Sequence, residues 1–340
     1  MTPERLQELA ERYRALRLAV VGDFCLDRYF EIDPARAEVS IETGLPVHNI
    51  INVRAQPGAA GTILNNLVAL GVGEIFPVGF CGEDGEGYEL LRALRALRGV
   101  NTRHFLQTPL RRTFTYGKPL ILEPGQPPRE MSRLDVKNWT PTPPEVTAIL
   151  RRSIASLRPQ IDAVILMDQV DAPETGVVSS GLLAEFAEGA GGPPVIADSR
   201  RGLRDFPPVI FKMNAAELSA LTGMPTDAPV LEIRRAAAEL AARNGRSVFV
   251  TIAERGLIGA LPDGQIEHVS ALPLRGPIDV VGAGDSVTAN LTAALAAGAT
   301  LREALQLAAL ASSIVIHQLG TSGTASFTEM AALLARTSAT

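Results

Sequence analysis

Residues 18–23 read LAVVGD, a short run of apolar side chains that ends on a glycine and an aspartate. Such a run predicts a strand that is buried on both faces of a parallel sheet and delivers polar groups at its carboxyl end. Helical patterns such as residues 230–245 separate it from further runs of the same kind. These runs are DAVILMD at 162–168, PVIAD at 194–198, VIFKMN at 209–214 and SVFVTI at 247–252. The alternation predicts an α/β fold with a doubly wound, mainly parallel sheet flanked by helices.

Two stretches, from about 27 to 54 and from about 103 to 135, break this alternation and instead show short strands joined by turns. We therefore expect a single domain over residues 1–340, with a small β-sheet inserted in it as a lid. Such a sheet leaves strand edges and an apolar face exposed, so we also expect a homodimer that pairs through the lid.

The composition favours a folded protein with a small-molecule partner. Hydrophobic residues make up 46% of the chain, and 32 basic against 37 acidic residues give a net charge of −5 without a long run of either sign. This balance argues against nucleic acid or a membrane as a partner. The two cysteines, Cys25 and Cys81, are too few for a disulfide framework, and no signal-peptide pattern is present, so we expect a cytoplasmic location.

The stretch DVVGAGDSVTANLTAALAAG at 279–298 places a Gly-Ala-Gly turn directly before a helix of small apolar residues. Four backbone amides can then point at an anion such as a phosphoryl group, namely those of Gly282, Ala283, Gly284 and Asp285. Asp285 is placed to stay ionised at the positive end of this helix and to take a proton from an attacking alcohol. A glycine turn with Asp285 as an ordinary helix cap is the alternative.

Two further pairs follow sheet strands. Asn214 and Glu217 open a helix at a spacing that puts both on one face, where together they could hold Mg²⁺ through water. The same spacing forms a near capping box, which alone accounts for the pair. Thr251 ends a strand and Gly256 turns into the next, which suits a close approach of a nucleotide to the backbone, although a plain hairpin has the same pattern.

In their order along the chain, these motifs resemble the ribokinase or PfkB family of sugar kinases, over nearly the whole sequence. The series consists of GDFCLD at 22–27, PGAAGTILNNLVALG at 57–71, RRTF at 111–114, NxxE at 214–217, TxxxxG at 251–256 and DVVGAGD at 279–285. The chain also resembles the kinase domain of the bacterial heptose-phosphate kinases, at residues 22–29, 133–135, 198–200 and 319–321. We expect any linked nucleotidyl transfer to reside in another chain.

The resemblance implies a ribokinase-like fold and an ATP-dependent phosphotransferase. Its reaction would pass the γ-phosphoryl group of magnesium-bound ATP to a hydroxyl of a small sugar or sugar phosphate, with a heptose phosphate as the nearest suggestion. By resemblance, Asp285 is the catalytic base, and the anion hole is formed by Gly282, Ala283 and Gly284. The resemblance also implies that Asn214 and Glu217 organise magnesium and phosphates, and that the nucleotide is bound by Thr251, Gly256 and Gly284. It further implies that Asp23 and Asp27 bind sugar hydroxyls and that Asp279 belongs to a monovalent-cation site for K⁺.

Two turns depart from the family pattern. In the sugar-binding turn, Gly58 is kept, but the second glycine is Ala59 and the asparagine is Thr62. A hydroxyl there replaces an amide, so we expect a different arrangement of acceptor hydroxyls, with Asn66 as a candidate to compensate or as a solvated helix residue. In the nucleotide loop, Ala253 stands where a glycine is common.

A phosphorylated acceptor would need a cation near the lid. The available side chains are Arg111, Arg112, Lys118, Arg133, Arg200 and Arg201. From these we select Arg112 and Arg133 as substrate-binding residues.

Two other functions stay open. A nucleoside kinase of the same fold would place a base against apolar lid residues, although an aromatic content of 5% weakens this idea. A catalytically weak pseudokinase that senses a metabolite would explain the altered sugar turn. The intact GAGD, with Asp285, argues against the sensor, because a pure sensor needs no base.

Overall fold

The computed structural model describes residues 1–187 and 192–337, so the remaining residues of the expected 1–340 domain lie outside the described part. Its strands are β1 (Arg17–Gly22), β2 (Phe24–Ile32), β3 (Glu38–Val39), β4 (Pro46–Val47), β5 (Ile50–Ala59), β6 (Glu74–Gly82), β7 (Phe105–Thr108), β8 (Thr115–Ile121), β9 (Arg129–Glu130), β10 (Leu134–Val136), β11 (Ala163–Asp168), β12 (Val195–Ser199), β13 (Ile210–Asn214), β14 (Val248–Thr251), β15 (Leu257–Ala260) and β16 (Ile266–Val269).

The helices are α1 (Pro3–Tyr13), α2 (Ala60–Ala69), α3 (Gly85–Ala96), α4 (Pro144–Leu157), α5 (Ser180–Ala187), α6 (Ala215–Thr222), α7 (Val230–Asn244), α8 (Ala283–Ala296), α9 (Leu301–Val315) and α10 (Phe327–Thr337). In the described ranges, none of these helices is both long enough and apolar enough to cross a membrane.

The main sheet has the strand order β16-β15-β14-β13-β12-β11-β1-β6-β7. Its strands from β14 through β1 to β7 run parallel to their neighbours, whereas β15 and β16 pair antiparallel at one end. The order reverses next to β1, as expected of a doubly wound sheet. This architecture confirms the fold predicted from the sequence.

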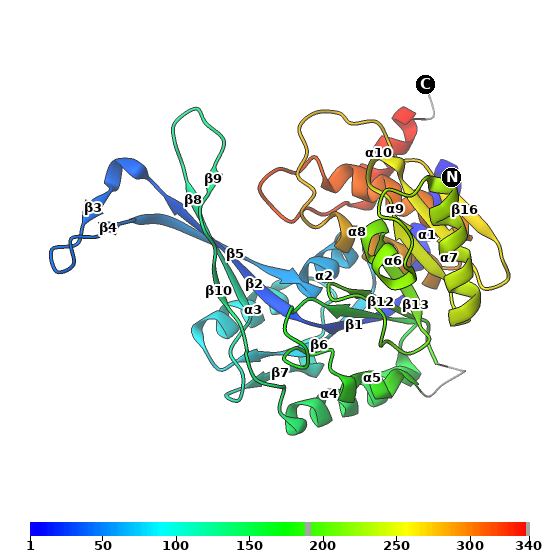
Figure 1. Cartoon of the computed structure of the whole chain (residues 1–340), viewed down its shortest axis with the longest axis horizontal. Coiled ribbons are helices and arrows are strands. Elements are labelled where there is room, and N and C mark those ends of the chain that lie inside the picture. The colour runs from blue at the N-terminus through cyan, green and yellow to red at the C-terminus, as the bar shows by residue number, and fades with distance from the viewer. Residues whose placement is uncertain (188–191, 338–340) are drawn as a thin grey trace.

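Alternate side chains of each central strand enter two separate cores. In β1, Leu18 and Val20 pack into one core, and Ala19 and Val21 pack into the other. Helices α8 and α9 belong to the first core, and α4 and α5 belong to the second, so helices cover both sides of the sheet (Figure 1). Burial of both strand faces explains the unbroken apolar runs in the sequence.

A second sheet, with the order β10-β8-β2-β5 and with β9 beside β8, forms the lid. It reaches out from the α/β body, and the β3/β4 hairpin lies at its far end (Figure 1). The predicted second lid segment, 103–135, starts too early, because β7 pairs parallel with β6 in the main sheet. Phe105 in β7 packs edge-on against Phe24, the first residue of β2, with ring centroids 5.2 Å apart, so this strand contacts the root of the lid while it pairs in the main sheet.

The roots of the lid are tied to one loop, residues 169–177. Asp23, the single residue between β1 and β2, is fully buried and accepts hydrogen bonds from the amides of Gln169 (2.8 Å), Val170 (3.2 Å) and Val177 (2.6 Å). Arg111, just before β8, is also buried and donates to the carbonyl of Thr175 at 2.7 Å.

Candidate functional site

Three parallel strands end side by side next to the start of α8. Asp198 lies near the end of β12, while Asn214 and Thr251 end β13 and β14 and are partners in the strand register. Polar groups at the carboxyl edge of an open α/β sheet form its usual binding site. The runs that predicted these strands therefore also predicted the edge at which the site lies.

The start of α8 presents backbone groups rather than a capping side chain. Gly282 adopts a left-handed conformation at φ 80°, and no side chain caps the helix. The amide of Ala283 donates to the carbonyl of Val280 at 3.2 Å, so this amide is not free for an anion, which corrects part of the predicted cradle. The amides of Gly284 and Asp285 lie in the first helical turn, where an α-helix offers no carbonyl partner. They fit an anion.

A buried ion pair lies directly beneath this turn. Lys212 Nζ donates to Asp198 Oδ2 at 2.6 Å, and Thr288 Oγ1, one turn into α8, donates to the same oxygen at 2.8 Å. A Cβ built on Gly284 would stand only 3.1 Å from Lys212 Nζ. Neither Lys212 nor Asp198 was predicted as a site residue, because both lie inside runs that predicted strands. The signal that could have found them is a charged residue within an otherwise apolar, buried strand.

Asp285 sits among these charges. Burial raises its pKa, the negative charges of Asp198 and Asp27 raise it further, and Lys212 opposes them, so that the pKa is about 7. A carboxylate with such a pKa can both accept and release a proton near neutral pH. The effect of Asp27 also shows that the lid brings this residue close to Asp285.

Asn214 and Glu217 form the capping box that was the alternative to a metal site. The side chain of Asn214 accepts from the amide of Glu217 at 2.9 Å, and Glu217 Oε2 accepts from the amide of Asn214 at 2.7 Å. Glu217 also lies close enough to Lys212 and Asp198 for their charges to affect its pKa, which burial raises. One carboxylate with waters and phosphate oxygens is a common way to hold Mg²⁺, and Glu217 fits that mode.

On the lid side, Asp27 forms an ion pair with Lys118, with Nζ 3.0 Å from Oδ2. Gly58 makes room for it, because a Cβ there would lie 2.8 Å from Asp27 Oδ1. Thr62 is buried in α2, and its methyl group lies 3.5 Å from a Cβ built on Gly282. The structure therefore brings Asp27, Gly58 and Thr62 to the same side of the GAGD turn.

A chain of hydrogen bonds runs from this pair to the C-terminal loop. Lys118 Nζ also donates to the hydroxyl of Tyr29 at 3.3 Å, and Gln56 donates to the same hydroxyl at 3.4 Å. Thr321, in the stretch that resembles the heptose-phosphate kinases, donates to Gln56 Oε1 at 3.2 Å. The lid strands β2, β5 and β8 are thus joined to the C-terminal loop of the body.

Two predicted substrate residues do not reach this site. Asp23 has three backbone amides on its carboxylate, and burial together with the charge of Asp168 raises its pKa to about 6. Asn66 is fully buried, and its amide donates to the carbonyls of Thr62 (3.0 Å) and Gly323 (3.3 Å). Both side chains therefore hold backbone segments in place.

The candidate cations already have partners. Arg112 lies beside Asp84 at 3.5 Å, and Arg133 pairs with Asp135 and stacks on the ring of Tyr116. Lys118, Arg201 and Arg111 have Asp27, Asp168 and backbone carbonyls, respectively. Arg200 shares Asp171 with Lys137, with N–O distances of 3.3 and 3.0 Å, so two cations there face one carboxylate.

The two remaining predicted residues have structural reasons for their positions. Gly256 has φ 102°, and a Cβ there would lie 2.0 Å from the carbonyl oxygen of Val269, so the β14–β15 hairpin needs a glycine. Both carboxylate oxygens of Asp279 accept backbone amides, from Val281 (3.0 Å) and Gly320 (3.2 Å). These bonds hold the turn at 279–281 against the loop that contains Gly320, and each oxygen keeps capacity for a further ligand, so the K⁺ site at Asp279 stays a prediction.

The two alanines that replace family glycines are strained. Ala59 has φ 54° and Ala253 has φ 52°, in the left-handed region where a Cβ is unfavourable. Ala59 lies between Gly58 and α2 at the acceptor turn, and Ala253 begins the turn after β14. Both departures noted in the sequence therefore fall on backbone positions that still have a glycine conformation.

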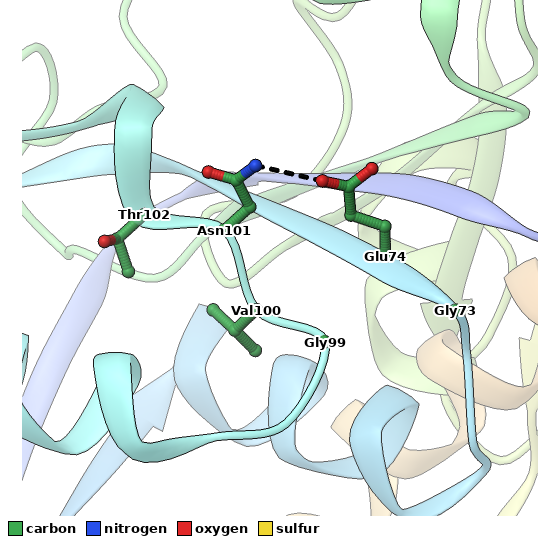
Figure 2. Close-up of a pocket in the computed structure, with 6 residues that line it drawn as sticks. All are labelled: Gly73, Glu74, Gly99, Val100, Asn101 and Thr102. Atoms are coloured by element: carbon green, nitrogen blue, oxygen red, sulfur yellow. Dashed lines mark hydrogen bonds between the residues drawn. The ribbon is translucent and has the colours of Figure 1, made fainter.

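A separate hollow of about 630 Å³ lies at the opposite edge of the sheet (Figure 2). It is lined by Gly73, Glu74, Gly99, Val100, Asn101 and Thr102. Its one acidic side chain, Glu74, already accepts from Asn101 at 2.9 Å and pairs with Arg17 at 3.0 Å. Since it starts from the amino end of β6, it is remote from Asp285 and does not belong to the site.

Comparison with known proteins agrees with this geometry. Residues 193–327 match the sequence model of the pfkB family carbohydrate kinases. The chain is 32% identical to the bifunctional protein HldE of Rhodospirillum rubrum (96% of this chain, 64% of that protein) and 32% identical to HldE of Paramagnetospirillum magneticum (93% and 63%). It therefore spans less than two thirds of the length of these relatives.

Solved structures share the fold. The Arabidopsis thaliana ribokinase complexed with ribose and ATP superposes with a TM-score of 0.67 at 23% identity, covering 94% of this chain and 98% of that one. Phosphofructokinase-2 of Escherichia coli in complex with fructose-6-phosphate gives 0.70 at 17% identity, covering 95% and 99%. At these identities the likeness shows the fold alone.

The family match places the chain in the class of phosphotransferases with an alcohol group as acceptor. Within that class, it belongs to the pfkB family of carbohydrate kinases and carries that family's kinase domain.

The strained alanines generate a stability prediction. Ala59→Gly and Ala253→Gly should each raise the free energy of unfolding by about 1 kcal/mol, because relief of the left-handed strain outweighs the added freedom of the unfolded chain. Denaturant unfolding measures the change. Ala242→Gly, at an exposed position of α7, is the matched control and should lower the free energy by about 1 kcal/mol. Equal destabilisation by all three substitutions would contradict the prediction.

Proposed function

We propose that the protein is an ATP-dependent kinase of a small sugar or sugar phosphate, with Asp285 as the base. The observation that carries this is one carboxylate of pKa about 7, in the uncapped first turn of α8, which feels the charges of both the lid residue Asp27 and the buried Lys212. A base must meet an acceptor and a phosphoryl group at once, and a position within the electrostatic range of the lid and at a helix N-terminus suits both. The family match and the ribokinase-type fold support the same chemistry.

In this mechanism the acceptor hydroxyl lies between Asp27 and Asp285. A carboxylate oxygen of Asp285 accepts the proton of that hydroxyl as the hydroxyl oxygen attacks the γ-phosphorus of ATP. The bond from this phosphorus to the β,γ-bridging oxygen breaks, and ADP leaves with the electron pair. The amides of Gly284 and Asp285 and the ammonium of Lys212 stabilise the charge on the phosphoryl oxygens. Glu217, with Asn214, would hold Mg²⁺ through water, and the ion would supply positive charge that neutralises the phosphates. Thr251 and Gly256 lie where the nucleotide approaches the backbone of the β14–β15 turn.

Asp285→Asn should lower acceptor-dependent ADP release by about 10²- to 10⁴-fold, because an amide cannot take the proton. The native rate should rise with pH through a midpoint near 7, since the base acts only when ionised. The assay uses MgATP with aldoses, ketoses, heptose phosphates and nucleosides. Asp227→Asn, an exposed aspartate, is the control and should keep native activity.

Turnover of nucleosides alone would favour the nucleoside kinase of the same fold. Metabolite binding without turnover, unchanged by Asp285→Asn, would favour the sensor.

We further propose that the acceptor is already phosphorylated, and a heptose phosphate is the first compound to test. The relatives are named bifunctional protein HldE, and one structural neighbour is a complex with fructose-6-phosphate. In this chain, Arg200 and Lys137 face one carboxylate, Asp171, which leaves excess positive charge. The charge of Arg200 also acts on Tyr116, which stands beside Asp27 in the lid sheet. We therefore propose Arg200, instead of Arg112, as the residue that binds the phosphate of the acceptor.

Arg200→Met should raise KM for a sugar phosphate by about 10- to 100-fold, the loss expected for a charge-assisted hydrogen bond to phosphate. KM for ATP should not change. Arg204→Met, an exposed arginine in the same loop, is the matched control. An equal effect of Arg200→Met on an unphosphorylated sugar would contradict a phosphate contact.

We also propose a homodimer formed through the lid. Strand β5 is exposed on both faces over residues 50–55, and the hairpin beyond it exposes apolar side chains. The apolar residues concerned are Val39, Ile41, Leu45, Ile50, Ile51 and Val53. A second copy would cover this area and the edge of β5.

Light scattering should give twice the chain mass for the native protein. Val53→Asp should give the monomer, because the partner sheet would have to bury a charge. The exposed substitution Val280→Asp, on the body, serves as the control and should leave the mass of the dimer unchanged. A native monomer at micromolar concentration would contradict the proposal.

A further inference from the structure

Asp198 joins three elements through one oxygen atom. Its Oδ2 accepts from Lys212 on β13 and from Thr288 on α8, while Asp198 itself belongs to β12. All three side chains are buried in the described structure. One oxygen that accepts hydrogen bonds from both donors restricts the position of each. The distance between the Lys212 ammonium and the first turns of α8 is therefore set by Asp198.

Lys212 has other carboxylates within reach of its charge. Asp285 and Glu217 both act on it, in addition to Asp198. An unrestrained ammonium would move toward the base or the NxxE pair, and either move would take it from the phosphoryl cradle. The hydrogen bond to Asp198 holds it where a Cβ on Gly284 would lie 3.1 Å away.

Stability alone gives a weak reason for this arrangement. A buried ion pair adds little net stability, because desolvation of the two charges offsets their attraction. A hydrophobic pair would fill the same space between β12, β13 and α8. A hydrophobic pair, however, would not place an ammonium group beside the start of α8.

We propose that Asp198 is a positioning residue, which acts on phosphoryl transfer by holding the ammonium of Lys212 beside the Gly282–Gly284 turn. Thr288 assists by orienting Asp198 Oδ2. This inference rests on the proposed kinase activity and adds to it the group that aligns its cation.

A double-mutant cycle in kcat/KM tests the coupling. Lys212→Met should lose about 100-fold and Asp198→Asn about tenfold, mainly in kcat, with KM for the acceptor unchanged. Because Asp198 acts through Lys212, the double variant should lose about 100-fold, as Lys212→Met does alone. A loss of about 1,000-fold, the product of the single effects, would overturn the inference, since it would mean that the two residues act independently.

A second pair of variants guards against misfolding of Asp198→Asn. Thr288→Val removes one hydrogen bond to Asp198 and should lower kcat about threefold, and this effect should vanish in the Lys212→Met background. Thr292→Val is the matched control: Thr292 lies one turn further along α8, and its hydroxyl donates only to the carbonyl of Thr288, at 2.7 Å. Equal losses in kcat for Thr288→Val and Thr292→Val would overturn the inference.

The test separates this inference from the proposed function. If Asp285→Asn abolishes turnover while the cycle is additive, the kinase stands and the positioning role falls. If no acceptor is turned over, the same cycle is measured on MgATP affinity, where non-additive losses support the role of Asp198 and additive losses overturn it. A chain that neither turns over an acceptor nor binds MgATP would overturn both proposals.

Discussion

A buried ammonium must have a carboxylate partner, and the site of this protein is arranged around that requirement. Lys212 lies in the middle of β13 and is buried, so its charge costs free energy unless Asp198 neutralises it. The pair can form only if β12 and β13 end at the same level, and Thr288 can join it only if α8 starts directly above them. The two hydrogen bonds to Asp198 Oδ2 thus require one level of the two strands and one position of the helix.

The protonation of Asp285 is a balance of opposing effects. Burial and the nearby negative charges favour the neutral acid, whereas Lys212 favours the carboxylate. The N-terminus of α8 supports the carboxylate as well, since it carries partial positive charge. Each contribution comes from a different element, namely the lid, the sheet and the helix. The lid makes the smallest of these contributions, through Asp27.

The sequence predicted best what depends on local pattern. The run 18–23 became a strand that is buried on both faces, and the GAGD stretch became the start of α8. Strand β6 was not predicted, and it contains Pro77, a residue that argues against a central strand. The structure tolerates this residue because pairing with β7 begins only at Gly79.

The partners of individual side chains could not be predicted from the sequence, because they depend on which strand ends lie next to one another in the fold. Asp23 and Asp27 are four residues apart and were given one role, yet three backbone amides enclose the first, whereas the second pairs with Lys118 and its charge acts on Asp285. Lys212 had no motif of its own. Asn214 and Glu217 were offered as a cap or a metal site, and the capping box now in place leaves Glu217 near the charged pair.

No flexible linker joins β1 of the body to β2 of the lid. Only Asp23 separates a strand of the body from a strand of the lid, and it is held by the same loop that holds Arg111 at the other root. The usual flexible hinge is therefore missing at the positions where one is expected. Large movements of the β3/β4 end of the lid relative to the body therefore require β2 and β5 to bend along their length. Stiffness built into those two strands would slow opening and closing without any change at Asp285.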